Sequence, residues 1–150
     1  MKKLLFSIAF IFVLFAANAQ YKHSLGVAFG RPSGLSYKTF ISKDRALDFT
    51  LGGLGSYFSL SGMYEIHGKL ENNLQYYYGP GAHIGSWNGH NYGNGVFAGI
   101  DGVIGIELDP NIPFAFSLDL RPGINVIGNN WDDEYHWIFW QTQFSIRYIF

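Results

Sequence analysis

The stretch Ile138-Phe-Trp-Gln-Thr-Gln-Phe-Ser-Ile-Arg-Tyr-Ile-Phe150 closes the chain and alternates between two kinds of side chain. One set is apolar or aromatic apart from a threonine: Ile138, Trp140, Thr142, Phe144, Ile146, Tyr148 and Phe150. The other set is mainly polar: Phe139, Gln141, Gln143, Ser145 and Arg147. Successive side chains of a β-strand point to opposite faces, so this period of two predicts a strand with one apolar and one polar face.

The rest of the chain, from residue 21 onward, divides into similar segments of about nine to fourteen residues, bounded by turn-forming residues. The breaks are rich in Gly, Pro, Asn, Asp and Ser, and they fall at residues 31–34, 42–45, 55–58, 71–73, 88–95, 109–113 and 128–136. Seven breaks leave eight segments. The pattern predicts an all-β fold, an eight-stranded antiparallel up-and-down β-barrel.

One rule of facing fits all the segments, because the ionisable side chains within them fall on the face opposite to the apolar one. This polar set contains Lys38, Asp48, Glu65, His67, Lys69, His83, Asp101, Glu107, Asp119, Arg121 and Arg147. A soluble lipocalin-type barrel has the reverse arrangement, and a β-sandwich with one wet face carries far more Lys and Glu than this chain. An apolar outside around a polar lumen therefore predicts a transmembrane barrel, closed so that every backbone group is paired.

Composition narrows the class of protein further. Of 150 residues, 48% are hydrophobic, 19% aromatic and 14% charged, whereas charged residues supply roughly a quarter of a typical soluble chain. These figures exclude disorder, and a formal net charge of -1 without a basic stripe argues against nucleic-acid binding. The absence of cysteine excludes disulfides, thiolate metal sites and cysteine nucleophiles.

The first residues have the layout of a secretory signal peptide. Two lysines precede an apolar stretch, residues 4–17, and the small-x-small sequence Ala17-Asn-Ala19 follows. This stretch is shorter than the roughly 18 residues that a membrane-spanning helix needs, which disfavours an N-terminal anchor. We therefore expect residues 1–19 to be cleaved and residues 20–150 to form a single exported barrel domain.

With these features the chain resembles the small outer-membrane β-barrel proteins of Gram-negative bacteria, the OmpA-like and OmpX-like class. The ending is similar to the signature by which the barrel assembly machinery recognises its clients, a C-terminal aromatic residue with apolar residues at alternate positions before it. The matching residues are Phe144, Ile146, Tyr148 and Phe150. The resemblance implies a monomer in the outer membrane, in contact with the lipid bilayer and lipopolysaccharide, with both termini in the periplasm.

Aromatic residues gather towards both predicted ends of the barrel. Those near the terminal end are Tyr21, His23, Phe114, Phe116, Tyr148 and Phe150. Those near the other end are Trp87, Tyr92, Trp131, Tyr135, Trp137 and Trp140. Amphipathic rings favour the membrane interface, so the pattern predicts two aromatic girdles, and the strand propensity of aromatic residues is the simpler alternative.

The polar interior is the strongest candidate for a functional element. Eight strands enclose room only for side chains or for one small ligand, and the basic residues can pair with the acidic ones. We expect a plugged, charged lumen and a structural or accessory role without catalysis. The alternative of a narrow channel or small-ligand conduit rests on inward glycines that leave volume unfilled: Gly26, Gly52, Gly79, Gly81, Gly85, Gly105 and Gly123.

A lipopolysaccharide-modifying enzyme is the other alternative. The lipid A palmitoyltransferase and deacylase of this class use a His with a Ser and an acidic residue near the outer rim. Residues of those types near the predicted rim are Ser86, His90, Asp132, Asp133, Glu134 and His136. They do not match the motif of either enzyme, and the acidic run lacks the spacing of a cation-binding loop, so we expect no catalytic residue, metal or cofactor.

Overall fold

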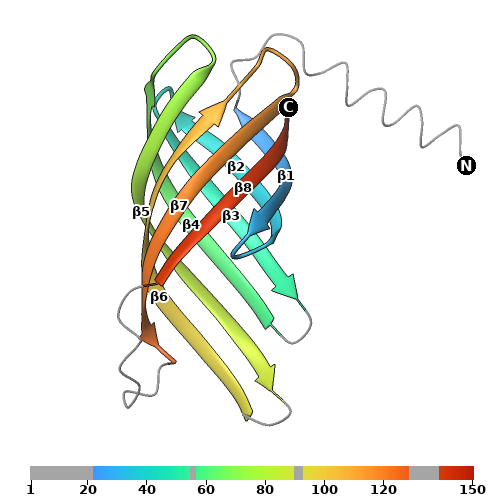
Figure 1. Ribbon diagram of the computed structural model, residues 1–150, viewed down its shortest axis with the longest axis vertical. Helices are drawn as coiled ribbons and strands as arrows, with labels where there is room; N and C mark the ends of the chain where they lie inside the picture. The colour runs from blue at the N-terminus through green and yellow to red at the C-terminus, as the bar shows by residue number, and fades with distance from the viewer. Residues whose placement is uncertain (1–21, 55–56, 90–92, 129–138) are drawn as a thin grey trace, which may run out of the picture.

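The computed structural model describes residues 22–54, 57–89, 93–128 and 139–150. They form antiparallel strands that close into one barrel in sequence order, with β8 pairing back onto β1 (Figure 1). The strands are β1 (His23–Gly30), β2 (Gly34–Ser42), β3 (Arg45–Leu54), β4 (Tyr57–Lys69), β5 (Leu74–Gly89), β6 (Gly93–Leu108), β7 (Phe114–Ile127) and β8 (Phe139–Ile149). The predicted all-β fold with eight antiparallel strands is confirmed. Among the described residues, no helix has the length and apolar character needed to cross a membrane.

The two-residue period decides which face of each strand turns inward. In β8, Gln143, Ser145 and Arg147 are completely buried, while 40% of Phe144 is exposed. Ser117 of β7 pairs directly with Ser145 and is buried as well. Because paired residues point to the same face, the polar rows of neighbouring strands meet inside the barrel.

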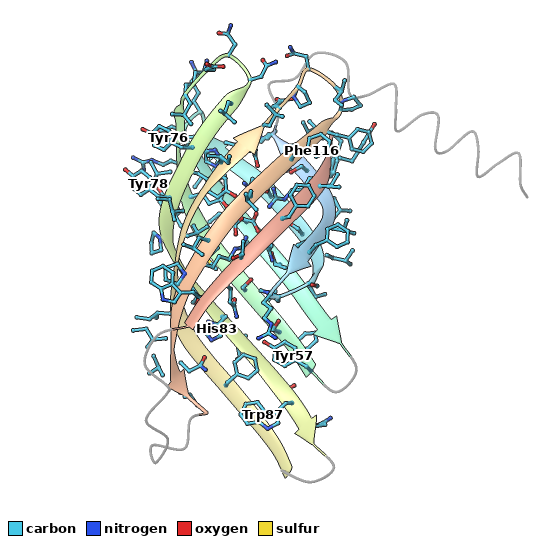
Figure 2. All side chains as sticks on the ribbon, viewed as in Figure 1. Tyr57, Tyr76, Tyr78, His83, Trp87 and Phe116 are labelled. Carbon is cyan, nitrogen blue, oxygen red and sulfur yellow. The ribbon has the colours of Figure 1, made fainter. Side chains whose placement is uncertain are left out.

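The outer surface of the barrel is apolar. Every strand exposes large apolar side chains on this face, for example Leu25, Leu35, Phe49, Leu60, Ile84, Ile104, Leu118 and Phe144 in order from β1 to β8. Figure 2 shows Tyr76 and Tyr78 projecting from the same surface, where they are 41% and 49% exposed. A soluble domain has the opposite distribution, with charged residues almost never fully buried.

The seam between β1 and β8 brings the two ends of the described chain together. Ser24 pairs with Ile149, and the backbone N–H of Phe150 donates to the carbonyl oxygen of His23 over 3.0 Å. The rings of His23 and Phe150 stack with centroids 6.1 Å apart. The last residue of the chain therefore takes part in closing the barrel.

The barrel has two distinct ends. The terminal end carries the first and last described residues and the short turns 43–44, 70–73 and 109–113. The loop end carries the other four connections. Gly30 and Gly128 lead out of β1 and β7 at the loop end with φ angles of 122° and 91°, in a region that side chains with a Cβ rarely adopt.

Strand lengths differ from the sequence-based expectation at the loop end. The predicted break at residues 88–95 is too long, because Asn88 pairs with Asn94 and Gly89 with Gly93. As a result β5 and β6 reach 16 residues each and project beyond the other strands (Figure 1). Similarly, Tyr57 of the predicted break at 55–58 already belongs to β4. Continuous hydrogen-bonded pairing has prevailed over the turn propensity of Asn and Gly.

The aromatic residues of the predicted girdles divide into two groups. At the terminal end, Phe114 and Tyr148 make an outward edge-to-face pair with centroids 5.5 Å apart. At the loop end, Trp140 is exposed on the outer face, whereas Trp87 belongs to the inward row of β5. The prediction that Trp87 belongs to an outer aromatic girdle is therefore wrong, because its ring lines the inside of the barrel. Tyr21, Tyr92, Trp131, Tyr135 and Trp137 lie outside the described residues.

Candidate functional site

The inside of the barrel contains two adjoining regions. An ionic cluster occupies the part towards the terminal end, and a cavity opens towards the loop end. The residues of the ionic cluster are Lys38, Asp48, Glu65, Glu107, Asp119, Arg121 and Arg147. Each of these side chains is at most 2% exposed, because each comes from the inward row of its strand.

Lys38 and Arg147 form the centre of the ionic cluster. The ammonium nitrogen of Lys38 lies 2.7 Å from Oε2 of Glu65 and 2.8 Å from Oε2 of Glu107. The guanidinium of Arg147 donates to Asp48 through Nη2, and to Ser117 and Glu107 through Nη1 over 2.8 and 3.3 Å. A buried charge is tolerated only with such compensation, so this arrangement fixes both side chains firmly.

Arg121 and Tyr77 extend the ionic cluster towards the cavity. Nε of Arg121 donates to Oδ1 of Asp119 over 2.8 Å, and the hydroxyl of Tyr77 donates to Oδ2 of the same carboxylate over 2.8 Å. The ammonium nitrogen of Lys38 also lies 4.3 Å from the centroid of the Tyr77 ring. Sequence reasoning missed Tyr77, although it shares the inward phase of His83 in the same strand.

His67 and Lys69, near the terminal end of β4, lie in different environments. Nε2 of His67 lies 2.9 Å from Oε2 of Glu65, and its ring stacks on that of Tyr77 with centroids 5.1 Å apart. Lys69, which we expected to join the polar network, is instead exposed at the end of the strand. Alternation predicts which face of the sheet a side chain occupies, but not how far along the barrel axis it lies. For a lysine at a strand end, extending the ammonium group into solvent costs less free energy than burying it.

Without Lys69, the carboxylates inside the barrel outnumber the cations. The carboxylates are Asp48, Glu65, Asp101, Glu107 and Asp119, and the cations are Lys38, Arg121 and Arg147. Each interior histidine contacts one of these carboxylates, His67 that of Glu65 and His83 that of Asp101.

Six consecutive inward pairs between β5 and β6 each combine one glycine with one larger residue. The consecutive pairs are Tyr77 with Gly105, Gly79 with Val103, Gly81 with Asp101, His83 with Gly99, Gly85 with Phe97, and Trp87 with Gly95. A Cβ on Gly85 would collide with the ring of Phe97, and one on Gly105 with that of Tyr77. The space beside the inward glycines of this seam is therefore not all empty, because side chains from the paired strand lie over several of these glycines.

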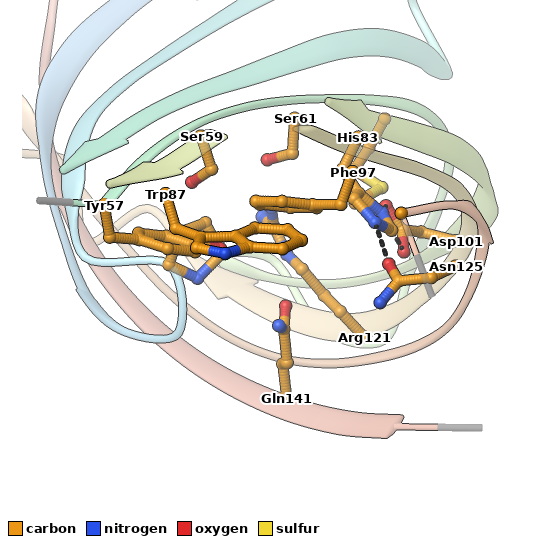
Figure 3. Close-up of a pocket in the computed structure, with 13 residues that line it drawn as sticks. Tyr57, Ser59, Ser61, His83, Trp87, Phe97, Asp101, Arg121, Asn125 and Gln141 are labelled. Carbon is orange, nitrogen blue, oxygen red and sulfur yellow. Dashed lines mark hydrogen bonds and ion pairs between the residues drawn. The ribbon is translucent and has the colours of Figure 1, made fainter. Parts of the chain in front are cut away.

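The cavity at the loop end has a volume of about 370 Å³. We call it the loop-end cavity; it is lined by Pro32, Tyr57, Ser59, Ser61, Met63, His83, Trp87, Phe97, Asp101, Arg121, Asn125, Gly128 and Gln141. Figure 3 shows the rings of Tyr57, Trp87 and Phe97 reaching inward from their strands. Phe97 stacks on Tyr57 and on Trp87 with centroids 5.5 and 5.7 Å apart, which makes one aromatic wall.

His83 joins the polar side of the loop-end cavity. Its Nδ1 lies 2.8 Å from Oδ2 of Asp101, and its Nε2 lies 2.7 Å from Oδ1 of Asn125 (Figure 3). Ser61 pairs with His83 across β4 and β5, but its hydroxyl forms no hydrogen bond to the imidazole. Oxygen atoms of Asp101 and Asn125 thus engage both ring nitrogens of His83.

Of the residues considered for catalysis or metal binding, Ser86 alone lies among the described residues. Ser86 belongs to the outward row of β5 and does not line the loop-end cavity. His90, His136 and the acidic residues Asp132, Asp133 and Glu134 lie outside the described residues. Within the part of the chain that is described, no group of three or more His, Asp or Glu residues is placed to hold a metal ion.

Comparison with known proteins adds no assignment. No protein family model, no curated protein and no solved structure matches this chain.

Proposed function

We propose that the chain is an integral protein of the bacterial outer membrane, a monomer in contact with lipid and lipopolysaccharide, with both termini in the periplasm. Its role is structural or accessory, without catalysis. The observation that carries this proposal is the inverted distribution of polarity, in which Lys38, Arg121 and Arg147 are buried while large apolar side chains are exposed on every strand.

The energetic argument follows from the solvent that each face would meet. An Arg or Lys on the lipid-facing side at mid-bilayer costs about 2 to 4 kcal/mol. In β7, Leu118 and Ile124 are exposed on the outer face, whereas Asp119 and Arg121 are buried inside. Water around this barrel would meet an unusually large apolar surface, so hydrocarbon is the environment that suits it.

The end of the chain supports recognition by the barrel assembly machinery. Phe144, Ile146 and Tyr148 share the outward phase of β8, and Tyr148 packs against Phe114. Phe150 follows the end of the strand and is 44% exposed. The resemblance of the ending to an assembly signal therefore agrees with its position on the outer face.

The ionic cluster favours a barrel without a continuous pore. Lys38, Asp48 and Arg147 are each 0% exposed, and their side chains, from β2, β3 and β8, meet inside the barrel. Any ion crossing the lumen would have to separate these buried pairs. We therefore expect the intact protein to give no steady conductance in a planar lipid bilayer.

Folding of the full chain from urea into phosphatidylcholine vesicles tests the proposal. Leu118→Arg places a charge on the outer face of β7, and Asn72→Arg places one in an exposed turn at the terminal end. We expect Leu118→Arg to lower the yield of folded, heat-modifiable protein severely and Asn72→Arg to leave it unchanged. Equal yields, or efficient folding of the unaltered chain without lipid or detergent, would show that the outer face does not contact hydrocarbon.

A further inference from the structure

The loop-end cavity has the size of a small-molecule site. Its volume of about 370 Å³ lies at the lower end of the roughly 300 to 1,000 Å³ of ligand pockets. Arg121 and Met63 line it on the side of the ionic cluster, and Tyr57 lines it near the loop end of β4. A molecule of one or two rings would fit, whereas a lipid chain or a polymer segment would not be enclosed.

One wall of the loop-end cavity offers aromatic surface to a ligand. Tyr57 is 40% exposed and Trp87 is half-buried, so each ring keeps free surface besides its stacking on Phe97. The face of an aromatic ring carries partial negative charge and attracts the slightly positive C–H groups of a saturated ring. This wall therefore suits a flat ligand with an apolar face.

Two serines on β4 line the loop-end cavity with unsatisfied hydroxyl groups. Ser59 and Ser61 are 2% and 3% exposed, and neither Oγ has a hydrogen-bond partner among the described residues. Figure 3 places both on one side of the aromatic rings, with Arg121 and Gln141 on the other side. A buried hydroxyl without a partner is destabilising, so a ligand that both donates and accepts hydrogen bonds would remove this penalty.

The charged groups of the loop-end cavity already have partners. Arg121 is paired with Asp119 over 2.8 Å, and Asp101 with His83 over 2.8 Å. An ionic ligand would have to compete with these existing contacts, and a purely apolar ligand would leave the serine hydroxyls unsatisfied. The remaining class is a neutral ligand with hydroxyl groups around its edge and an apolar face.

We propose that the loop-end cavity binds a neutral monosaccharide or disaccharide. A pyranose ring has a face of C–H groups to lie on Tyr57 or Trp87, and hydroxyl groups to reach Ser59, Ser61 and Asn125. The inference rests on the closed barrel itself. It rests on the proposed function only in that an outer-membrane orientation turns the loop end to the outside, from which the sugar would enter.

Equilibrium dialysis of radiolabelled glucose and maltose against the folded full chain tests the inference. The protein is held in lauryldimethylamine oxide micelles, whose headgroup carries no sugar, and circular dichroism verifies the strands in each sample. We expect saturable binding of at least one sugar. The variant Ser59→Ala/Ser61→Ala should raise its Kd by about tenfold or more, whereas Ser86→Ala, on the outer face of β5, should leave it unchanged.

Each other outcome overturns the inference. No saturable binding to verified folded protein means that the cavity holds only solvent. Equal affinity in the double serine variant and in the Ser86→Ala control means that the sugar binds elsewhere. Binding of inorganic phosphate or indole in place of either sugar assigns the cavity to an ionic or an apolar ligand. All of these results are independent of insertion into vesicles, which tests the proposed function separately.

Discussion

The indole ring of Trp87 on β5 occupies the space above Gly95, its partner on β6, so that a Cβ at position 95 would collide with atoms of that ring. The three atoms nearest to such a Cβ all belong to the side chain of Trp87. It belongs to the run of pairs that match a glycine with a larger residue along the seam between β5 and β6. These pairs allow aromatic rings inside a narrow barrel without forcing the strands apart.

Replacement of the seam glycine should therefore displace Trp87. We expect Gly95→Ala to lower the free energy of unfolding by about 1 to 3 kcal/mol, because overpacking forces side chains out of their preferred rotamers. Gly102→Ala is the matched control, since its Cβ would point outward with the nearest atom of Pro122 at 3.5 Å. Urea titration in detergent micelles, followed by tryptophan fluorescence, measures both. Equal unfolding midpoints would contradict the assigned position of the indole ring.

The ionic cluster predicts a large difference between two positively charged residues. Arg147→Met removes the partner of Asp48 and Glu107 inside the barrel, and we expect a loss of about 3 to 5 kcal/mol of stability. Lys69→Met, at the exposed end of β4, should change stability by less than about 0.5 kcal/mol. Denaturant unfolding of both variants in the same detergent gives the comparison. If Lys69→Met were as destabilising as Arg147→Met, our placement of Lys69 outside the cluster would be incorrect.

Two neighbouring tyrosines on β5 test which residues of this strand face inward, because replacing either with phenylalanine removes only its hydroxyl oxygen. Tyr77→Phe deletes the hydroxyl that donates to Asp119 over 2.8 Å, which should cost about 1 kcal/mol. Tyr78→Phe alters the outer face, where 49% of the residue is exposed, and should be nearly neutral. The same unfolding assay distinguishes them. A larger effect at position 78 would reverse the inward and outward rows of β5.

The buried pairs also predict the behaviour of the lumen towards ions. The unaltered protein should remain silent in planar bilayers at neutral pH. Removal of two large side chains that span the interior, in Arg121→Ala/Arg147→Ala, should either open brief conductance steps or prevent folding, and circular dichroism tells these apart. Steady single-channel currents through the unaltered protein would show that the ionic cluster does not block the lumen.

The sequence predicted those features that depend on the alternation of side chains. The inward rows of β7 and β8 follow from a period of two, and Arg147 and Asp119 are buried as that period requires. The strict alternation within a strand is sufficient for this assignment, because a shift of one residue would turn every apolar side chain inward.

Features that depend on position between strands were not predictable in the same way. Lys69 has the inward phase but lies at the end of its strand, where it is exposed. Trp87 shares the inward phase of His83, so alternation alone places it inside; its aromatic character led to the girdle prediction instead. The ring of Phe97 lies over Gly85 because of the register between β5 and β6. The sequence of a single strand does not reveal this register. The loop-end cavity depends on residues from many strands and therefore emerged only from the structure.

The ionic cluster lies between the loop-end cavity and the terminal end of the barrel. If this cluster closes the lumen, as we propose, a ligand of the loop-end cavity enters and leaves through the loop end only. Its residence time then depends on its release towards that side and not on passage through the barrel.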